Sequence, residues 1–268
     1  GFIGSRYGVP FAEPFTLTSL RMLIVVSMLL TVSVLSRAPW PRDWKSIAHI
    51  AVAGLLVHAA YLSGVMYAIY LQLPLGFIAL VAGLQPLLTA LLSYLTLNER
   101  LRGTQWLGML LGFLGVLIAI ASKFVLSEVR VGSLLAAGIA LLGITIGTLY
   151  QKRFCQNMDL RTGGVIQFTA TGVLLFLLAL LFETRTVVWV PQFVFAILWL
   201  AVVLSIGAIS LLYVMIRNGA TSKVASLFFL TPSVTAVMAY FLFHESLSWF
   251  AIGGLVISAC GVALVTRK

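Results

Sequence analysis

Residues 84–101 read LQPLLTALLSYLTLNERL, and residues 230–247 read LTPSVTAVMAYFLFHESL. Moving the first stretch by 146 positions places it on the second without a gap, and the register extends over residues 67–122 and 213–268. Shared Pro, Glu, Gly and Tyr residues are informative, because Leu and Ala match by chance in so apolar a chain. The matched pairs are Tyr67 with Tyr213, Pro86 with Pro232, Thr89 with Thr235, Tyr94 with Tyr240, Glu99 with Glu245, Gly108 with Gly254, and Gly115 with Gly261. The chain therefore carries an internal repeat.

The composition is that of an integral membrane protein. The 268 residues are 61% hydrophobic and 9% charged, with a mean hydropathy of +1.11, whereas a soluble domain is roughly 25% charged. A helix needs about 20 apolar residues to cross a bilayer, and in lipid a helix satisfies every backbone polar group within its own segment. We therefore expect nine complete helical spans. They are residues 15–36, 46–69, 73–97, 104–122, 131–150, 163–182, 191–216, 220–243 and 247–265.

Residues 1–9 (GFIGSRYGV) are interpreted as the end of a tenth span that begins before Gly1. The alternative is a short re-entrant or interfacial segment. With the tenth span, the chain divides into two repeats of five helices, at residues 1–122 and 123–268. Because five is odd, the second repeat enters the membrane from the opposite side, as in the inverted repeats of many transporters. We predict an all-α membrane protein with ten transmembrane helices in two inverted five-helix repeats.

Basic residues are concentrated in alternate connections between the spans. One set of connections holds 12 of the 17 Lys and Arg residues, and the opposite set holds Lys123, Arg130 and Arg185. The positive-inside rule places the basic set and the C-terminus in the cytoplasm. The net charge of +10 is dispersed over five connections, so nucleic acid is not expected as a partner. The 12 residues are Arg37, Arg42, Lys45, Arg100, Arg102, Lys152, Arg153, Arg161, Arg217, Lys223, Arg267 and Lys268.

The sequence offers no motif for a metal, a cofactor or ATP. Its two cysteines, Cys155 and Cys260, have no metal-ligand spacing, and there is no P-loop. A membrane-embedded enzyme would need paired catalytic groups at membrane depth, where only His58 is clearly placed. A non-transporting sensor or scaffold would be favoured by a long soluble extension. These two classes remain the alternatives to transport, and we expect no enzyme activity.

The repeated Pro…Thr-Ala…Glu-x-Leu stretches resemble the corresponding ends of each repeat in the EamA family of the drug/metabolite transporter superfamily. Each stretch is followed by a glycine-spaced helix, WLGMLLGFLGVLIAI (106–120) or AIGGLVISACGVALV (251–265), as in that family. The segments FIGSRYG (2–8) and PFTLTSLRML (14–23) resemble its first helix and the start of its second. The resemblance implies ten helices in the bacterial inner membrane, with both termini cytoplasmic. It also implies transport of small metabolites, often the export of amino acids.

Polar and aromatic side chains inside the spans are the candidate substrate ligands. They are His58, Tyr61 and Gln85 in the first repeat and Trp199 in the second. A buried polar group left without a partner costs about 1–3 kcal/mol, and a shared wet cavity near the membrane midplane would satisfy several such groups at once. His58 and Tyr61 are three residues apart and share a face in a regular helix. Alternatively, His58 bonds between helices and Trp199 serves only in packing.

Arg6 is the cation expected in the first helix, where it binds a substrate carboxylate or extends towards the membrane surface. Pro86 and Pro232 lie in the middle of their spans and are candidate hinges, although static kinks are also common in membrane helices. The expected partners are a small-molecule substrate and the lipid bilayer, with protons as a candidate coupling ion. The sequence leaves open whether the protein is a monomer or a homodimer.

Overall fold

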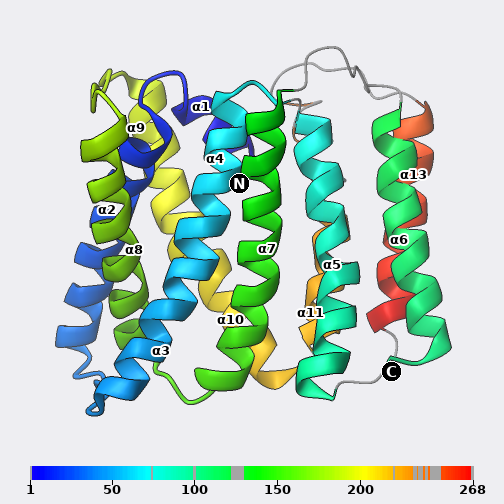
Figure 1. Cartoon of the computed structure of the whole chain (residues 1–268), viewed down its shortest axis with the longest axis horizontal. Coiled ribbons are helices and arrows are strands. Elements are labelled where there is room, and N and C mark those ends of the chain that lie inside the picture. The colour runs from blue at the N-terminus through cyan, green and yellow to red at the C-terminus, as the bar shows by residue number, and fades with distance from the viewer. Residues whose placement is uncertain are drawn as a thin grey trace.

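The structure is a computed structural model of the chain, and it describes residues 2–73, 75–98, 101–121, 130–219, 221–231, 234, 238, 241 and 249–266. In this part of the chain the regular elements are all helices, with one isolated antiparallel bridge between Ala12 and Val187. The long helices stand side by side, with their axes nearly parallel or antiparallel to one another (Figure 1). Most connections therefore gather at the two ends of the bundle.

The described helices follow the spans expected from hydropathy. Five are long and apolar enough to cross a bilayer: Pro14–Leu35, Trp44–Tyr70, Val131–Phe154, Leu160–Phe182 and Pro191–Asn218. Shorter apolar helices, Val81–Leu97, Gly103–Ala119 and Ile252–Thr266, overlap the segments expected to span at residues 73–97, 104–122 and 247–265. The elements are α1 (Phe2–Gly8), α2 (Pro14–Leu35), α3 (Trp44–Gly54), η1 (Leu55–Ala60), α4 (Tyr61–Tyr70), α5 (Leu75–Leu97), α6 (Gly103–Ala121), α7 (Val131–Phe154), α8 (Leu160–Phe182), α9 (Pro191–Leu198), η3 (Trp199–Ala208), α10 (Ile209–Asn218), α11 (Thr221–Ser226), η4 (Leu227–Phe229) and α13 (Trp249–Thr266).

The offset of 146 residues reappears in the local structure of the helices. Helices α2 and α8 begin at equivalent positions, at Pro14 and at Leu160. The two π-helical segments also correspond, because η1 (Leu55–Ala60) moved by 146 positions falls inside η3 (Trp199–Ala208). The repeat in the sequence is therefore a repeat of local structure as well.

Helices α6 and α13 pack closely through glycines. A Cβ atom added at Gly108 would lie 2.7 Å from the carbonyl oxygen of Gly261, and one at Gly115 would lie 2.6 Å from that of Gly254. Small residues of this kind let the backbones of two membrane helices approach each other. Since the higher-numbered glycine of α6 meets the lower-numbered glycine of α13, the two helices run antiparallel.

Two carboxylates join α2 and α8 at one end of the bundle. Glu183, just after α8, accepts hydrogen bonds of 2.7 Å from the backbone N–H groups of Phe15 and Thr16 and from the Thr16 hydroxyl. In return, Glu13 accepts from the N–H groups of Thr184 (2.7 Å) and Arg185 (3.1 Å). A carboxylate at a helix N-terminus satisfies free N–H groups and is favoured by the helix dipole.

The opposite ends of the same two helices are joined in a similar way. Arg161, in the first turn of α8, donates a 2.8 Å hydrogen bond to the hydroxyl of Ser36, and the Thr162 hydroxyl donates one of 2.7 Å to the carbonyl of Pro39. Asp159 caps α8, and its side-chain hydrogen bonds with Arg161 hold the pKa of that carboxyl below its usual value. Thr162 is the repeat equivalent of Thr16, so at both ends of the bundle a threonine at the same repeat position forms a hydrogen bond between the helices.

Candidate functional site: a cavity between the two halves of the chain

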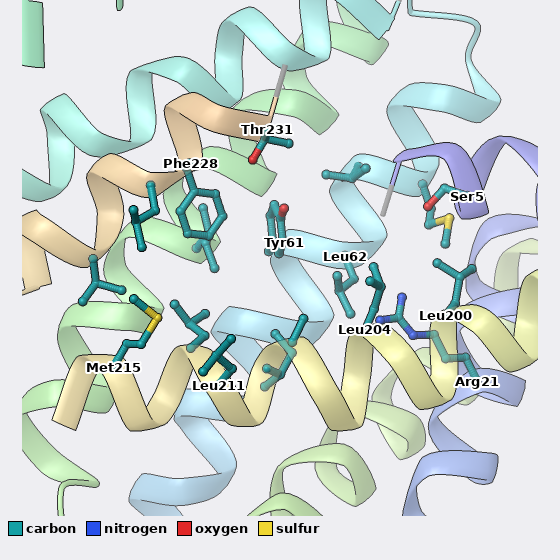
Figure 2. A pocket seen from close by; sticks show the side chains of 18 residues that line it. Ser5, Arg21, Tyr61, Leu62, Leu200, Leu204, Leu211, Met215, Phe228 and Thr231 are labelled. Carbon is teal, nitrogen blue, oxygen red and sulfur yellow. The ribbon is translucent and has the colours of Figure 1, made fainter. Parts of the chain in front are cut away.

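A cavity of about 350 Å³ lies between the first and second halves of the chain. Helices α1, α2 and α4 contribute from the first half, and α7, η3, α10, α11 and η4 contribute from the second (Figure 2). Its walls are mostly Leu, Val, Ile and Met side chains. The lining residues with polar side chains are Ser5, Arg21, Tyr61 and Thr231. A cavity of this size, apolar with a few polar groups, has the character of a small-molecule site.

Arg21 is the charged group of this cavity. Its side chain is only 1% exposed and extends from α2 towards the other lining residues (Figure 2). The Nε atom donates a 2.8 Å hydrogen bond to the hydroxyl of Ser205 on η3. Within the part of the chain that the structure describes, the two terminal nitrogens of the guanidinium have no hydrogen-bond or ion-pair partner. The positive charge therefore faces the cavity without a counter-ion from the described residues.

None of the carboxylates that the structure describes forms a hydrogen bond or an ion pair with Arg21. The sequence has seven Asp and Glu residues. Four belong to the described residues, and all four lie at helix ends: Glu13, Asp43, Asp159 and Glu183. The other three, Glu99, Glu128 and Glu245, lie outside the described residues. A buried cation without a partner is costly, so its presence in a cavity suggests a functional role.

Tyr61 and Gln85 lie at two neighbouring cavities that share lining residues. Tyr61 lines the main cavity and also a smaller one of about 20 Å³ beside it, and Gln85 lines the smaller one. The Gln85 amide nitrogen lies 3.4 Å from the Thr89 hydroxyl, whereas its carbonyl oxygen is buried and has no partner among the described residues. Both residues are therefore placed where a polar ligand or water in the two cavities could reach them.

His58 lies outside the residues that line the main cavity. It is buried, and its ring stacks on Phe168 of α8 with the ring centroids 4.2 Å apart. Its Nε2 atom lies 3.3 Å from the hydroxyl of Tyr213. Tyr61 lines the cavity, whereas His58 packs against Phe168 of α8. The segment Leu55–Ala60 is π-helical, so the spacing of a regular α-helix does not apply between the two residues.

The remaining candidates are distributed around the cavity. Trp199 is partly buried on η3, where its ring stacks at 6.1 Å on Phe195, and it is not a lining residue. Pro86 is buried inside the continuous helix α5. Arg6 belongs to α1, but its side chain lies outside the described residues, as does the whole of Pro232.

The sequence interpretation did not select Arg21 or Ser205 as ligands. The available signal was an arginine seven residues inside an apolar run that begins at Pro14, too deep for a residue of the membrane surface. No group of three or more His, Cys, Asp or Glu residues that could hold a metal occurs among the described residues.

The helical bundle, its membrane-length helices and the central cavity define a polytopic membrane protein of the transporter type. The chain belongs to the EamA-like transporter family, whose description matches residues 1–121 and 131–267. It is therefore a membrane transporter by family, and both halves of the chain match the same family unit.

The relatives carry names of the same class. The "Uncharacterized transporter YvbV" of Bacillus subtilis (strain 168) is 27% identical over 266 residues, which are 98% of this chain and 86% of that protein. The "Uncharacterized inner membrane transporter YedA" of Escherichia coli (strain K12) is 28% identical over 265 residues, 97% of this chain and 84% of that protein. A solved structure titled "Crystal structure of protein" shares the fold, with a TM-score of 0.76 and 23% identity over 94% of this chain and 87% of that one.

Proposed function

We propose that this protein is a secondary transporter that moves small metabolites, such as amino acids or related amphipathic compounds, across the bacterial inner membrane. The observation that carries the proposal is the cavity between the two halves of the chain, apolar over most of its wall with a buried cation at one side. Transport by alternating access would open this cavity to one side of the membrane at a time. Export is the direction that we propose, with protons as a candidate coupling ion.

The proposed architecture is ten helices in two inverted repeats, residues 1–122 and 123–268. The packing of α6 on α13 supports it, because Gly108 contacts Gly261 and Gly115 contacts Gly254. Under the offset of 146, Gly108 corresponds to Gly254 and Gly115 to Gly261. Each glycine thus contacts the equivalent of the other, which is the pattern of an interface with a two-fold axis. The antiparallel direction of the two helices places that axis across them, as inverted topology requires.

The proposed movement uses the irregular positions of the helices. π-Helical segments are frequent at functional sites, and here they occur at equivalent positions in the two halves, in η1 and η3. Leu204 of η3 lines the cavity, and the neighbouring Ser205 accepts the hydrogen bond from Arg21. Pro86 in α5 and its repeat equivalent Pro232 remain the proposed hinges, because a proline weakens the helical hydrogen bonding around it.

Filling the cavity is expected to block transport. Ala208 is a small lining residue of η3, and Ala208→Trp would place an indole in the cavity. The indole would occupy space that the substrate needs, and if binding is weakened by about 1–3 kcal/mol, as for overpacking of a core, we expect transport to fall about tenfold. The measurement is uptake of a panel of radiolabelled amino acids and organic acids by proteoliposomes that contain equal amounts of folded protein.

The matched control is Val202→Trp, on the same element at an exposed position that does not line the cavity. This variant is expected to transport within about twofold of the wild type, as exposed substitutions usually change little. If Ala208→Trp transports as well as Val202→Trp, the substrate does not pass through this cavity.

The proposed orientation places the connection between α7 and α8 in the cytoplasm. Asn157 is exposed in this connection, so a maleimide should label Asn157→Cys only after cells are permeabilised. The native Cys155 should not compete, because burial raises the pKa of its thiol to about 11. At neutral pH only about one in ten thousand of these thiols is then ionised.

Arg185→Cys, in the opposite set of connections, is the positive control in intact cells. Strong labelling of Asn157→Cys in intact cells would reverse the orientation.

A further inference from the structure

Arg21 presents unused hydrogen-bond donors to the cavity. A guanidinium has five N–H groups in a planar fork, and the Ser205 hydroxyl engages only the one on Nε. The four N–H groups on the terminal nitrogens have no partner among the described residues, although the side chain is only 1% exposed. The hydrogen bond to Ser205 fixes the plane of the guanidinium, so its open edge is held in one direction.

We propose, on the basis of the transport function proposed above, that the cavity binds an amphipathic monocarboxylate through Arg21. The two carboxylate oxygens would accept paired hydrogen bonds from the guanidinium, the geometry in which arginine binds carboxylates most strongly. Tyr61, whose hydroxyl has no hydrogen-bond partner among the described residues, lies on the same cavity and supplies a further donor. Ser205 is a positioning residue for Arg21.

The apolar wall determines the rest of the ligand. Leu200 and Leu204 of η3, Leu211 and Met215 of α10, and Phe228 of η4 line the space beyond Arg21 (Figure 2). An aliphatic or aromatic body would be buried against these side chains at a gain of about fourfold in affinity for each methylene group removed from water. Arg21 is the single cation among the lining residues that the structure describes, and it matches a single negative charge, whereas a phosphate monoester carries about −1.5 to −2 at neutral pH.

The same wall disfavours an ammonium group, and this narrows the substrate class. The polar groups that line the cavity besides Arg21 are Ser5, Tyr61 and Thr231, and no carboxylate is among the lining residues that the structure describes. An ammonium held in this space would add a second buried positive charge beside Arg21 without an acidic partner. A carboxylate that lacks an α-amino group therefore fits the cavity better than an amino acid does.

The test compares four ligands that share one apolar body and differ in charge. The ligands are 3-phenylpropanoate, its neutral amide, the zwitterion phenylalanine, and the cation 3-phenylpropylamine. Their dissociation constants are measured with the purified full-length protein in lipid nanodiscs, for the wild type and for Arg21→Gln. Arg130→Gln removes an exposed positive charge at the start of α7, so it controls for the change in net charge.

Hydrogen bonds to a charged group contribute enough for about a tenfold to hundredfold preference. We expect the wild type and Arg130→Gln to bind 3-phenylpropanoate at least tenfold more tightly than the other three ligands. In Arg21→Gln this preference should disappear through weaker binding of the carboxylate, while the affinity for the amide stays the same. The inference is overturned if Arg21→Gln keeps the preference, if phenylalanine or the amine binds as tightly as the carboxylate, or if the wild type does not bind the carboxylate at millimolar concentration.

Uptake by proteoliposomes separates this inference from the proposed function. If the wild type moves phenylalanine or the amide independently of Arg21, the carboxylate site is refuted while the transport function stands. If the carboxylate binds through Arg21 but the wild type does not carry it or any other ligand across the bilayer, transport is refuted while the binding site stands.

Discussion

Gly254→Ala is expected to lower the melting temperature of the protein, whereas Gly253→Ala, one residue earlier, should leave it unchanged or slightly higher. A Cβ atom at Gly254 would lie 2.5 Å from both the backbone nitrogen of Ala119 and the carbonyl oxygen of Gly115. Both atoms belong to the backbone of α6 and cannot rotate away. At Gly253 a Cβ atom would meet nothing within 4 Å. The two variants therefore add the same methyl group to the same helix, with and without a steric conflict.

Overpacking of a well-packed contact costs about 1–3 kcal/mol, and each kcal/mol shifts the melting temperature of a chain of this size by about 2–4 °C. The measurement is thermal unfolding of the two purified variants in one detergent, followed by tryptophan fluorescence. Equal melting temperatures would contradict the close approach of α6 and α13. That approach also carries the two-fold packing pattern, so the result bears on the proposed repeat architecture.

Arg21→Met is expected to raise the melting temperature of the ligand-free protein. The guanidinium is buried, and its charge has no acidic partner among the described residues. Replacing buried charged groups by apolar side chains of similar size stabilises some proteins by about 1–4 kcal/mol. The unfavourable burial of Arg21 is thus a feature of the binding site, of the kind that functional sites retain at the expense of stability.

The matched control is Arg21→Lys, which keeps a positive charge at this position and should not raise the melting temperature. Thermal unfolding is measured without ligand, at equal protein and detergent concentrations. A melting temperature for Arg21→Met well below that of the wild type would show that Arg21 has a structural role in the empty protein. In that case the cation is paired in the folded state, and its assignment as a ligand for substrate carboxylates loses its physical basis.

Hydropathy predicted where the described helices lie along the chain. The run at residues 15–36 is the helix Pro14–Leu35, and the run at 191–216 lies within the helical stretch Pro191–Asn218. Apolar length decides these bounds, because a spanning helix ends where water can again bond to the backbone. The start of α7 at Val131 and the end of α5 at Leu97 also coincide with the expected limits.

The candidate site was harder to predict from the sequence than the helices were. Hydropathy gives the depth of a residue in the membrane, but the direction of its side chain around the helix axis depends on tertiary packing. His58 packs against Phe168 of α8, whereas Tyr61, three residues further along, lines the cavity. Arg21 was not among the predicted ligands, because its contact with Ser205 joins residues 184 positions apart. No local pattern encodes a contact of that separation.

The buried charge of Arg21 would make the proposed transport cycle sensitive to the membrane voltage. Arg21 contributes one positive charge to the empty cavity, and a bound carboxylate would cancel it. A full elementary charge moved across 100 mV changes the free energy by about 2.3 kcal/mol. With the cell interior negative, the empty protein would be drawn towards the state that opens its cavity to the cytoplasm, while the loaded, neutral protein would move outward without opposition from the field. The voltage alone would then favour export of an organic anion.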